Sequence, residues 1–374
     1  MSKHLNCIFP FESIFVDTRM DVSFCCAGTT SLGNLKETPI KDILNGKLAS
    51  DIRAGQFTDE GHPYCSSCVN LMNKGVSSQR TENIPDPNKN LTPDYFKLKR
   101  VDIRWSNTCN LSCNYCMPYF SSKWATILGT KEFHPISSNI ENQIFQFIEE
   151  NSEPTIDIML LGGEPLLQKQ NEKLLDLVPN SSICLITNLS IPIEGNSIAQ
   201  RLMKEPYVQW GVSFENIGDK FEYVRHGASW KIVENNLQYL KKHNKKVNLF
   251  PLYCIYSAFD LVELYDNVVA PGYVNHIEWQ LLTDDNLDVF NMPAELKSLA
   301  INEIDLCVAK YPTAPGIDVL KALRTTLQQS MSDTINKNVN FIKWTDNLEK
   351  NQMKKEKLFS DLWDNIYIKI KQSV

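Results

Sequence analysis

The sequence predicts an α/β protein with a largely parallel sheet, preceded by a small cysteine-rich unit and followed by a helical extension. Three observations lead to this prediction. Strand-like and helix-like segments alternate six times within residues 98–292, which is typical of parallel sheets with right-handed crossovers. Four cysteines gather in residues 1–68, and residues 293–374 keep apolar side chains at helical spacing.

The composition fits a globular protein with a large core. The chain has 374 residues, of which 43% are hydrophobic and 22% charged. The net charge is −6 and no long basic run occurs, so we expect no nucleic-acid partner. There is no run of about 18 apolar residues and no apolar core of a signal peptide near Met1, so we expect a cytoplasmic protein without a membrane partner. In that reducing compartment, eleven cysteines indicate metal binding or chemistry rather than disulfides.

Residues 1–68 are expected to form the first small domain. Residues 11–17 and 20–26 alternate like two strands of a hairpin. Thr38 can cap a helix whose first turn suits Pro39, and the helix should end near Gly55. The four cysteines of this domain, with a closing Cys-x2-Cys, fit either an iron–sulfur cluster or a zinc ion. They are Cys7, Cys25, Cys65 and Cys68. Cys26 is expected to be a spare thiol, since neighbouring strand residues point to opposite faces.

Residues 69–97 are polar and proline-containing, and we interpret them as a linker. The six expected strands follow: 98–105, 156–161, 183–186, 208–214, 247–255 and 277–282. Amphipathic helices are predicted over 138–151 and from Trp230, with Ser229 as its N-cap. Three isolated cysteines, Cys184, Cys254 and Cys307, are expected to be buried structural thiols.

A second cysteine group directly follows the first of these strands, where α/β folds place their sites. Cys109, Cys113 and Cys116 have Cys-x3-Cys-x2-Cys spacing. Three thiolates so close together can hold three irons of a 4Fe–4S cluster and leave the fourth iron open. A zinc knuckle or three buried thiols are the alternatives, but zinc usually takes four ligands and the nearest histidine is His134.

Other candidate residues stand where later strands end. Gly162 and Gly163 would let a ligand approach the backbone, and the acid Glu164 follows at once. Asn188 ends the third strand and Ser213 the fourth, with Arg225 twelve residues further on. The alternatives are an ordinary strand-to-helix turn, polar strand ends and a surface salt bridge.

The loop Cys109–Cys116, with Tyr115 just before its last cysteine, resembles the signature of radical S-adenosylmethionine (radical SAM) enzymes. The cysteine pattern of residues 1–68 resembles the twitch domain, the short form of the SPASM extension. The resemblance implies a partial (β/α)6 barrel in residues 98–292 and two 4Fe–4S clusters. It departs from the family at Met20 and Leu189, which stand where glycine is usual, and in the domain order, because the extension usually follows the barrel.

The resemblance also implies roles for the candidate residues. The open iron would bind S-adenosylmethionine, and the Gly-Gly-Glu motif would receive the amino group of this cofactor. Four further residues are expected to contact the cofactor: Tyr115, Asn188, Ser213 and Arg225. A low-potential electron donor of the ferredoxin or flavodoxin type is the implied partner.

The resemblance leaves the substrate open. Our main hypothesis is hydrogen abstraction from a small, sugar-like molecule, with net oxidation assisted by the auxiliary cluster. The alternative is a peptide- or protein-modifying enzyme, either a maturase or an epimerase in which Cys26 returns a hydrogen atom. A remote alternative is an inactive, zinc-stabilised binding protein.

Overall fold

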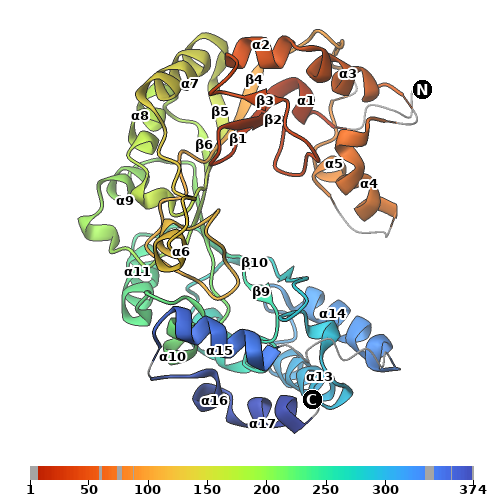
Figure 1. Ribbon diagram of the computed structural model, residues 1–374, viewed down its shortest axis with the longest axis vertical. Helices are drawn as coiled ribbons and strands as arrows, with labels where there is room; N and C mark the ends of the chain where they lie inside the picture. Colours follow the sequence, from red (N-terminus) through yellow and green to blue (C-terminus); the bar gives the residue numbers. More distant parts are fainter. Residues whose placement is uncertain are drawn as a thin grey trace. The chain divides into compact units, whose positions relative to one another are not determined.

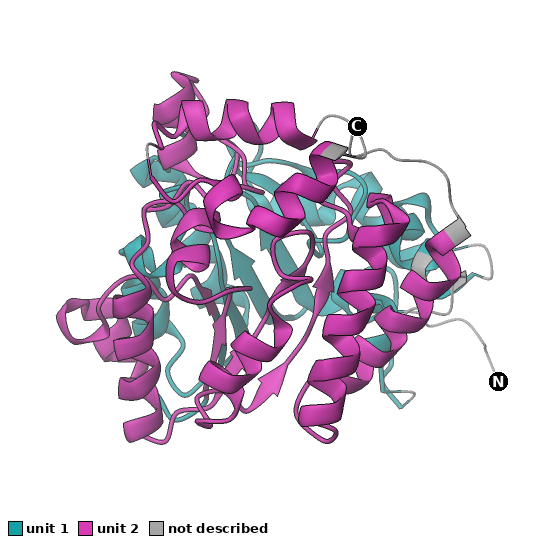
Figure 2. Cartoon of the chain, turned by 90° about the horizontal axis from the view of Figure 1, so that it is seen from below, with its two compact units in different colours: residues 1–108, 133–185, 204–207 teal, residues 109–132, 186–203, 208–374 magenta. Residues whose placement is uncertain are grey.

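The computed structural model describes residues 7–58, 61–73, 78–86, 88–332, 341–354 and 356–372. Contacts between residues divide the chain into two compact units (Figure 2). Unit 1 comprises residues 1–108, 133–185 and 204–207. Unit 2 comprises residues 109–132, 186–203 and 208–374. The predicted boundaries after residues 68, 97 and 292 do not coincide with this division, and they remain predictions.

Unit 1 is built on a sheet to which both the N-terminal hairpin and the first barrel strands belong. Strands β4 (Leu98–Ile103), β5 (Ser152–Leu160) and β6 (Ser182–Thr187) run parallel. β1 (Ser13–Val16) pairs in parallel with β4, and β2 (Asp21–Ser23) pairs antiparallel with β1. β3 (Gly33–Asn34) follows beside β2. The predicted hairpin is therefore confirmed, and it extends the sheet at the edge of β4.

The two faces of this sheet differ in burial. On one face the side chains of β1, β4 and β5 are fully buried: Ile14, Val16, Val101, Ile103, Ile158 and Leu160. On the other face Phe15, Arg100, Arg104 and Met159 are only half-buried, and we call this the open face. Because side chains alternate along a strand, one apolar face packs into the core and a more polar face remains accessible.

The helices of unit 1 follow the apolar pattern of the sequence. Helix α7 (Ser138–Asn151) buries Ile140, Ile144 and Phe147 as expected, and α8 (Gln170–Leu177) packs against it (Figure 1). The shorter elements are α1 (Phe9–Glu12), α2 (Ile40–Asn45), α3 (Lys47–Gly55), η1 (Pro63–Cys65), α4 (Ser66–Asn73), α5 (Gln79–Glu82) and η2 (Pro165–Leu167).

The helix predicted from Thr38 to Gly55 is wrong in two details. It consists of two helices, because Gly46 adopts an extended backbone (φ −67°, ψ 161°) between α2 and α3. Pro39, not Thr38, occupies the N-cap position, and no side chain caps the helix there. Glycine has little preference for helical geometry, so the break occurs where the helix has least to lose.

Unit 2 contains the remaining parallel strands. β7 (Val208–Val212), β8 (Val247–Leu249) and β10 (His276–Ile277) pair in parallel, and β9 (Leu252–Tyr253) pairs with β11 (Gln280–Leu281). The predicted strands 247–255 and 277–282 are each interrupted; the first break falls at Pro251, which has no N–H to donate. Ser229 occupies the N-cap of α11 (Trp230–Lys242), but its side chain accepts no capping hydrogen bond.

The other helices of unit 2 are short before residue 293 and long after it. The first group is α6 (Ser122–Leu128), η3 (Ile193–Gly195), α9 (Ser197–Leu202), α10 (Gly218–Val224), α12 (Leu261–Leu264), η4 (Tyr265–Val269) and η5 (Val289–Asn291). The second group, which confirms the predicted helical extension, is α13 (Ala294–Lys310), α14 (Ile317–Gln329), η6 (Ser330–Ser332), α15 (Phe341–Asn351), α16 (Phe359–Leu362) and α17 (Asp364–Gln372). In the described part of the chain, none of the helices is both long enough and apolar enough to cross a membrane.

Candidate functional site

Four thiols of unit 1 lie close together, as the cysteine pattern predicted. Cys7 precedes α1, Cys25 follows β2, Cys65 ends η1 and Cys68 lies in α4. Burial raises the pKa of the Cys7 thiol to about 12, and the charges of Cys25, Cys65 and Cys68 raise it further. Four thiolates held together away from water repel one another, and positively charged iron would relieve this repulsion.

Neighbouring side chains fix two of these cysteines. The Tyr64 hydroxyl accepts hydrogen bonds from the backbone N–H groups of Phe24 (2.9 Å) and Cys25 (3.3 Å). The Gln56 amide donates to Cys65 Sγ at 3.6 Å. A Cβ atom at Gly28 would lie 2.2 Å from the Tyr64 ring, so glycine is required at this position for Tyr64 to reach Cys25. Such supporting groups hold metal ligands in a fixed orientation.

Cys26 is separated from this group, as the alternation of strand residues predicted. Its side chain is exposed, and it interacts electrostatically with Asp102, Arg104 and Arg100 of β4. Cys26 therefore lies beside the open face of the sheet. Its neighbour Cys25 interacts electrostatically with Cys65 and lies within 4.0 Å of the Tyr64 hydroxyl.

The open face carries two buried polar atoms that lack partners. Asp102 is 8% exposed, and neither its Oδ1 atom nor Arg104 Nε forms a hydrogen bond with any described residue. The guanidinium groups of Arg100 and Arg104 each lie 5.0 Å from an aromatic ring, over Phe9 and Phe15 respectively. Buried polar atoms without partners are uncommon, so this donor and this acceptor mark a place where a ligand can bind. The sequence analysis missed both residues, because polar side chains at strand positions carry no distinctive spacing.

In unit 2, the three cysteines of the loop 109–116 also gather. Burial raises the pKa of the Cys113 thiol; the charge of Arg225 lowers it, and those of Cys116 and Cys109 raise it. The loop is held from outside by its backbone: Ser112 N–H donates to the His226 carbonyl (3.0 Å) and Asn114 N–H to the Val224 carbonyl (2.8 Å). The Trp124 indole donates to the Cys113 carbonyl at 2.9 Å.

Tyr115 and Arg225 meet at a carboxylate that the sequence analysis did not identify. Arg225 forms a forked ion pair with Glu215, with Nη2–Oε1 2.7 Å and Nε–Oε2 3.3 Å, and the Tyr115 hydroxyl donates to Glu215 Oε1 at 2.9 Å. Both side chains of the ion pair are buried. The alternative of a surface salt bridge for Arg225 is therefore wrong, because the pair is inside the unit and holds the loop through Tyr115. A contact of Arg225 with the cofactor remains a prediction.

Asn188 connects the end of β6 to the cysteine loop. Its amide donates to Asn110 Oδ1 (3.1 Å), and its Oδ1 atom accepts from the backbone and hydroxyl of Ser190. Leu189 has a positive φ of 53°, which explains why glycine is usual at this position in radical SAM enzymes. Ser213 N–H donates to the Thr187 carbonyl at 3.0 Å, so its backbone continues the strand.

The Gly-Gly-Glu turn of unit 1 packs on the residues just before the cysteine loop. A Cβ atom at Gly163 would lie 2.3 Å from the Thr108 carbonyl oxygen, so only glycine fits there. Glu164 N–H donates to the same carbonyl at 2.8 Å. The Glu164 carboxylate accepts from Leu166 N–H at 3.1 Å and caps η2. The turn thus has the structural role that we considered as an alternative, and the contact of Glu164 with the cofactor remains a prediction.

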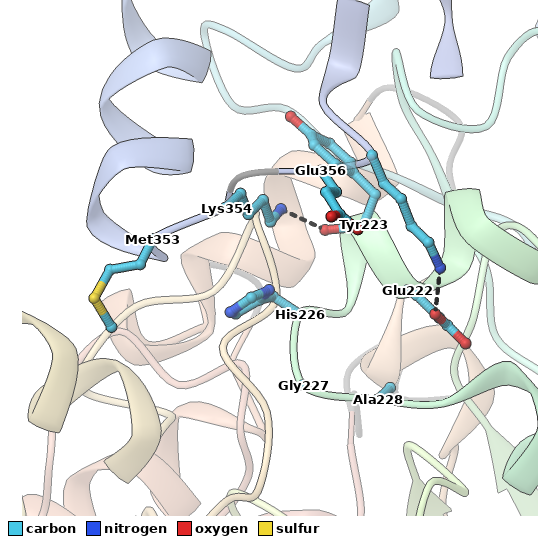
Figure 3. Close-up of a pocket in the computed structure, with 9 residues that line it drawn as sticks. Glu222, Tyr223, His226, Gly227, Ala228, Met353, Lys354 and Glu356 are labelled. Atoms are coloured by element: carbon cyan, nitrogen blue, oxygen red, sulfur yellow. Dashed lines mark hydrogen bonds and ion pairs between the residues drawn. The ribbon is translucent and has the colours of Figure 1, made fainter. Parts of the chain in front are cut away.

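Two cavities of unit 2 adjoin the cysteine loop, and the C-terminal extension lines both. The first, of about 340 Å³, lies beside Tyr115 and Cys116 and is closed by Trp344 and Asn347 of α15. The second, of about 370 Å³, is lined by Tyr223, His226, Met353 and Lys354, among others (Figure 3). The extension was expected only to pack, and its contribution here had no signal in the sequence.

Two isolated cysteines are buried as expected, and one is not. Cys254 and Cys307 are buried, whereas Cys184 is half-buried in β6, opposite Met159 of β5. Within the described residues, no three histidine, cysteine, aspartate or glutamate side chains converge on the position of a single metal ion. A 4Fe–4S cluster takes one thiolate on each iron, so its ligands surround a larger volume than those of one ion.

Two protein-family models match the chain. The radical SAM superfamily model matches residues 103–266, and the model of the iron–sulfur cluster-binding SPASM domain matches residues 7–69. No curated protein matches the chain.

Solved structures give weaker similarity. The chain is similar to anSMEcpe with bound AdoMet and a Kp18Cys peptide, with 19% identity, coverage of 54% of this chain and 57% of that chain, and a TM-score of 0.42. It is similar to Streptococcus suis SuiB bound to its precursor peptide SuiA, with 17% identity, coverage of 67% and 60%, and a TM-score of 0.42. In both cases the match spans less than two thirds of the solved chain.

Proposed function

Because the chain belongs to the radical SAM superfamily and carries an iron–sulfur cluster-binding SPASM domain ahead of its barrel, we propose that it modifies a peptide or protein side chain by radical chemistry. Its cofactors are S-adenosylmethionine and 4Fe–4S clusters. Bound iron–sulfur and S-adenosylmethionine together supply a carbon radical that removes a hydrogen atom from the substrate. The rest of the proposal concerns what the residues of this chain contribute.

We assign the two cysteine groups to two clusters. Cys109, Cys113 and Cys116 would hold the cluster that binds S-adenosylmethionine, since three thiols leave one iron free. The four-thiol group of unit 1 would hold the auxiliary cluster. The mutual repulsion of its thiols and the support from Tyr64 and Gln56 favour iron ligation. A low-potential donor of the ferredoxin or flavodoxin type would supply electrons.

The choice of a peptide over a sugar-like molecule rests on the unpaired donor and acceptor of the open face. Asp102 Oδ1 needs an N–H or O–H donor, and Arg104 Nε needs an acceptor. An amide group offers both at once, in a fixed planar arrangement. A substrate that satisfies these two atoms would gain more than an exposed hydrogen bond provides, because unpaired buried groups are costly.

The neighbours of Asp102 in the sheet support the same choice. Phe15 of β1 and Met159 of β5 stand directly beside it in register, and both are apolar and half-buried. They suit the apolar side chains of a peptide, whereas a sugar would leave its hydroxyl groups against them without partners. A sugar-like substrate nevertheless is the second candidate, since hydroxyl groups can also pair with Asp102 and Arg104.

We further propose that the reaction is a net two-electron oxidation. The first hydrogen atom leaves with the deoxyadenosyl group. The second electron goes toward the four-thiol site, and the accompanying proton goes to Asp102. Burial raises the pKa of Asp102 to about 6, while Arg104 and Arg100 lower it, so near pH 7 its carboxylate can accept that proton. Cys25 and Cys26 place the four-thiol site one residue away from the group that faces Asp102.

The test uses the anaerobically reconstituted enzyme with S-adenosylmethionine and a reductant. We would offer it a library of acetylated, amidated hexapeptides and, separately, a set of sugars and aminosugars. The expected result is 5′-deoxyadenosine formation that depends on peptide, with peptide products 2 Da lighter. Asp102→Asn should reduce turnover at least about tenfold, as expected for loss of a charged hydrogen-bond partner.

The matched control is Asp51→Asn, which removes an exposed carboxylate of α3 whose partner is Lys47. It should behave like the wild type. Turnover with sugars and none with peptides would show the substrate class to be wrong. Unchanged peptide turnover in Asp102→Asn would exclude the open face as the binding site.

A further inference from the structure

The segment that follows α15 lies against the outside of the cysteine loop. The Gln352 amide donates to the Ser112 carbonyl at 2.6 Å, and Lys354 Nζ donates to Asn114 Oδ1 at 3.3 Å. Ser112 and Asn114 are the two neighbours of Cys113 in the chain. The C-terminal segment therefore contacts the loop on both sides of its central cysteine.

Lys354 is an unusual cation because the groups that hold it are uncharged. Its Nζ atom donates to the Tyr223 carbonyl at 2.7 Å and lies 3.7 Å from the centre of the Tyr223 ring (Figure 3). Burial lowers the pKa of Lys354 to about 7, whereas Glu349 and Cys113 raise it. The Glu349 carboxylate is itself engaged by the Tyr223 hydroxyl and by Phe359 N–H, at 2.9 Å each.

A neighbouring lysine of the same segment offers a comparison. Lys357 lines the same cavity, but it is more exposed and pairs with the carboxylates of Asp219 (2.7 Å) and Glu222 (3.0 Å). Its charge is therefore compensated and screened by solvent. Lys354, in contrast, is buried and directs its charge toward the loop that holds Cys113.

We propose that Lys354 and Gln352 are positioning residues that raise the reduction potential of the iron–sulfur cluster held by Cys109, Cys113 and Cys116. The inference depends on the family cofactor and not on the peptide substrate. Reduction adds one electron to the cluster. A buried cation and a backbone held by N–H donors stabilise this added negative charge more than the oxidised state, because the local dielectric constant is low. The cluster then becomes easier to reduce by a physiological donor.

The test is a redox titration of the reconstituted holoenzyme, followed by electron paramagnetic resonance. The signal that changes when S-adenosylmethionine is added identifies the cluster with the open iron. In Lys354→Met, the ratio of reduced to oxidised cluster at a fixed potential should fall about tenfold, which corresponds to about 59 mV for one electron. Lys354→Arg keeps the charge and should retain a potential near that of the wild type.

Lys357→Met is the matched control, and its potential should equal that of the wild type. Gln352→Leu removes one hydrogen bond without changing charge, and a smaller shift in the same direction is expected. Equal potentials in the wild type, Lys354→Met and Gln352→Leu at full iron content would overturn the proposal. If Lys354→Met lost its iron, Gln352→Leu and Lys354→Arg would decide: no shift in the first, or a large shift in the second, would contradict it.

Discussion

At the scale of single residues, Asp102 joins two properties that usually exclude each other. It is 8% exposed, and yet its Oδ1 atom has no hydrogen-bond partner among the described residues. Burial raises its pKa from the model value of 3.8 to about 6. The folded chain thus holds the Asp102 proton more tightly than the unfolded chain does. Ionising this group at neutral pH costs folding free energy, which fits a residue kept for binding and not for stability.

The pH dependence of stability tests this property. Between about pH 4 and pH 6 the folded state binds more protons at Asp102 than the unfolded state, so the stability contributed by this group falls as pH rises. Asp102→Asn should remove that slope and raise the free energy of unfolding at pH 7 by up to about 3 kcal/mol. Urea unfolding at several pH values measures it. An unchanged slope in the variant would contradict the assignment.

Residues also mark where sequence reasoning reached its limit. The cysteines were identified because their spacing is distinctive, and Gly163 because its neighbours form a motif. Glu215 was not identified: its role comes from the fork with Arg225 and the hydrogen bond from Tyr115, which is a hundred residues away in the chain. Asp102, Arg104 and Lys354 were missed for the same reason. A side chain whose importance lies in a missing or an uncharged partner leaves no pattern in the sequence.

At the scale of elements, the four-thiol group depends on segments that have little structure of their own. Cys25 follows a three-residue strand, and Cys65 ends a single turn of helix. Such short elements cannot form a stable core, so we expect their arrangement to depend on bound iron. Tyr64 and Gln56 orient the ligands but do not replace the metal.

Iron content tests the assignment of two clusters. The reconstituted wild type should hold about eight irons, and Cys65→Ala with Cys68→Ala should hold about four, with the other cluster still reducible. Iron and zinc analysis of the two proteins measures this. The isolated thiol Cys307 provides the control, since Cys307→Ala removes a buried cysteine of α13 and should keep about eight irons. Zinc in the wild type with about four irons would show that the four-thiol site is not an iron–sulfur site.

Element boundaries were predicted less well than element order. The six barrel strands and α7 occur where the apolar pattern placed them. The sequence did not predict the extended Gly46 that separates α2 from α3, nor the interruption at Pro251. Both are local backbone effects that compete with an apolar pattern, and periodicity alone does not detect them.

At the scale of the whole molecule, the outcome of the reaction separates the two hypotheses for the second half of catalysis. Oxidation removes two hydrogens and adds none. Epimerisation returns one hydrogen atom from a thiol, for which Cys26 beside Asp102 is the candidate. In deuterium oxide we expect a product that is 2 Da lighter and carries no solvent deuterium. Mass spectrometry of the product measures it, and Cys26→Ala should still form that product. Deuterium in a product of unchanged oxidation state would instead make Cys26 the hydrogen donor.

The pairing of β1 with β4 has a consequence for how the protein is made. β1 (Ser13–Val16) leaves the ribosome long before its parallel partner β4 (Leu98–Ile103), since more than 80 residues separate them in the chain. At about 5–20 residues per second, this delay lasts from about four to about sixteen seconds. During this time the first cysteines are present without the strand that completes their sheet. Iron delivery to this end of the chain must therefore wait for synthesis to proceed well into the barrel.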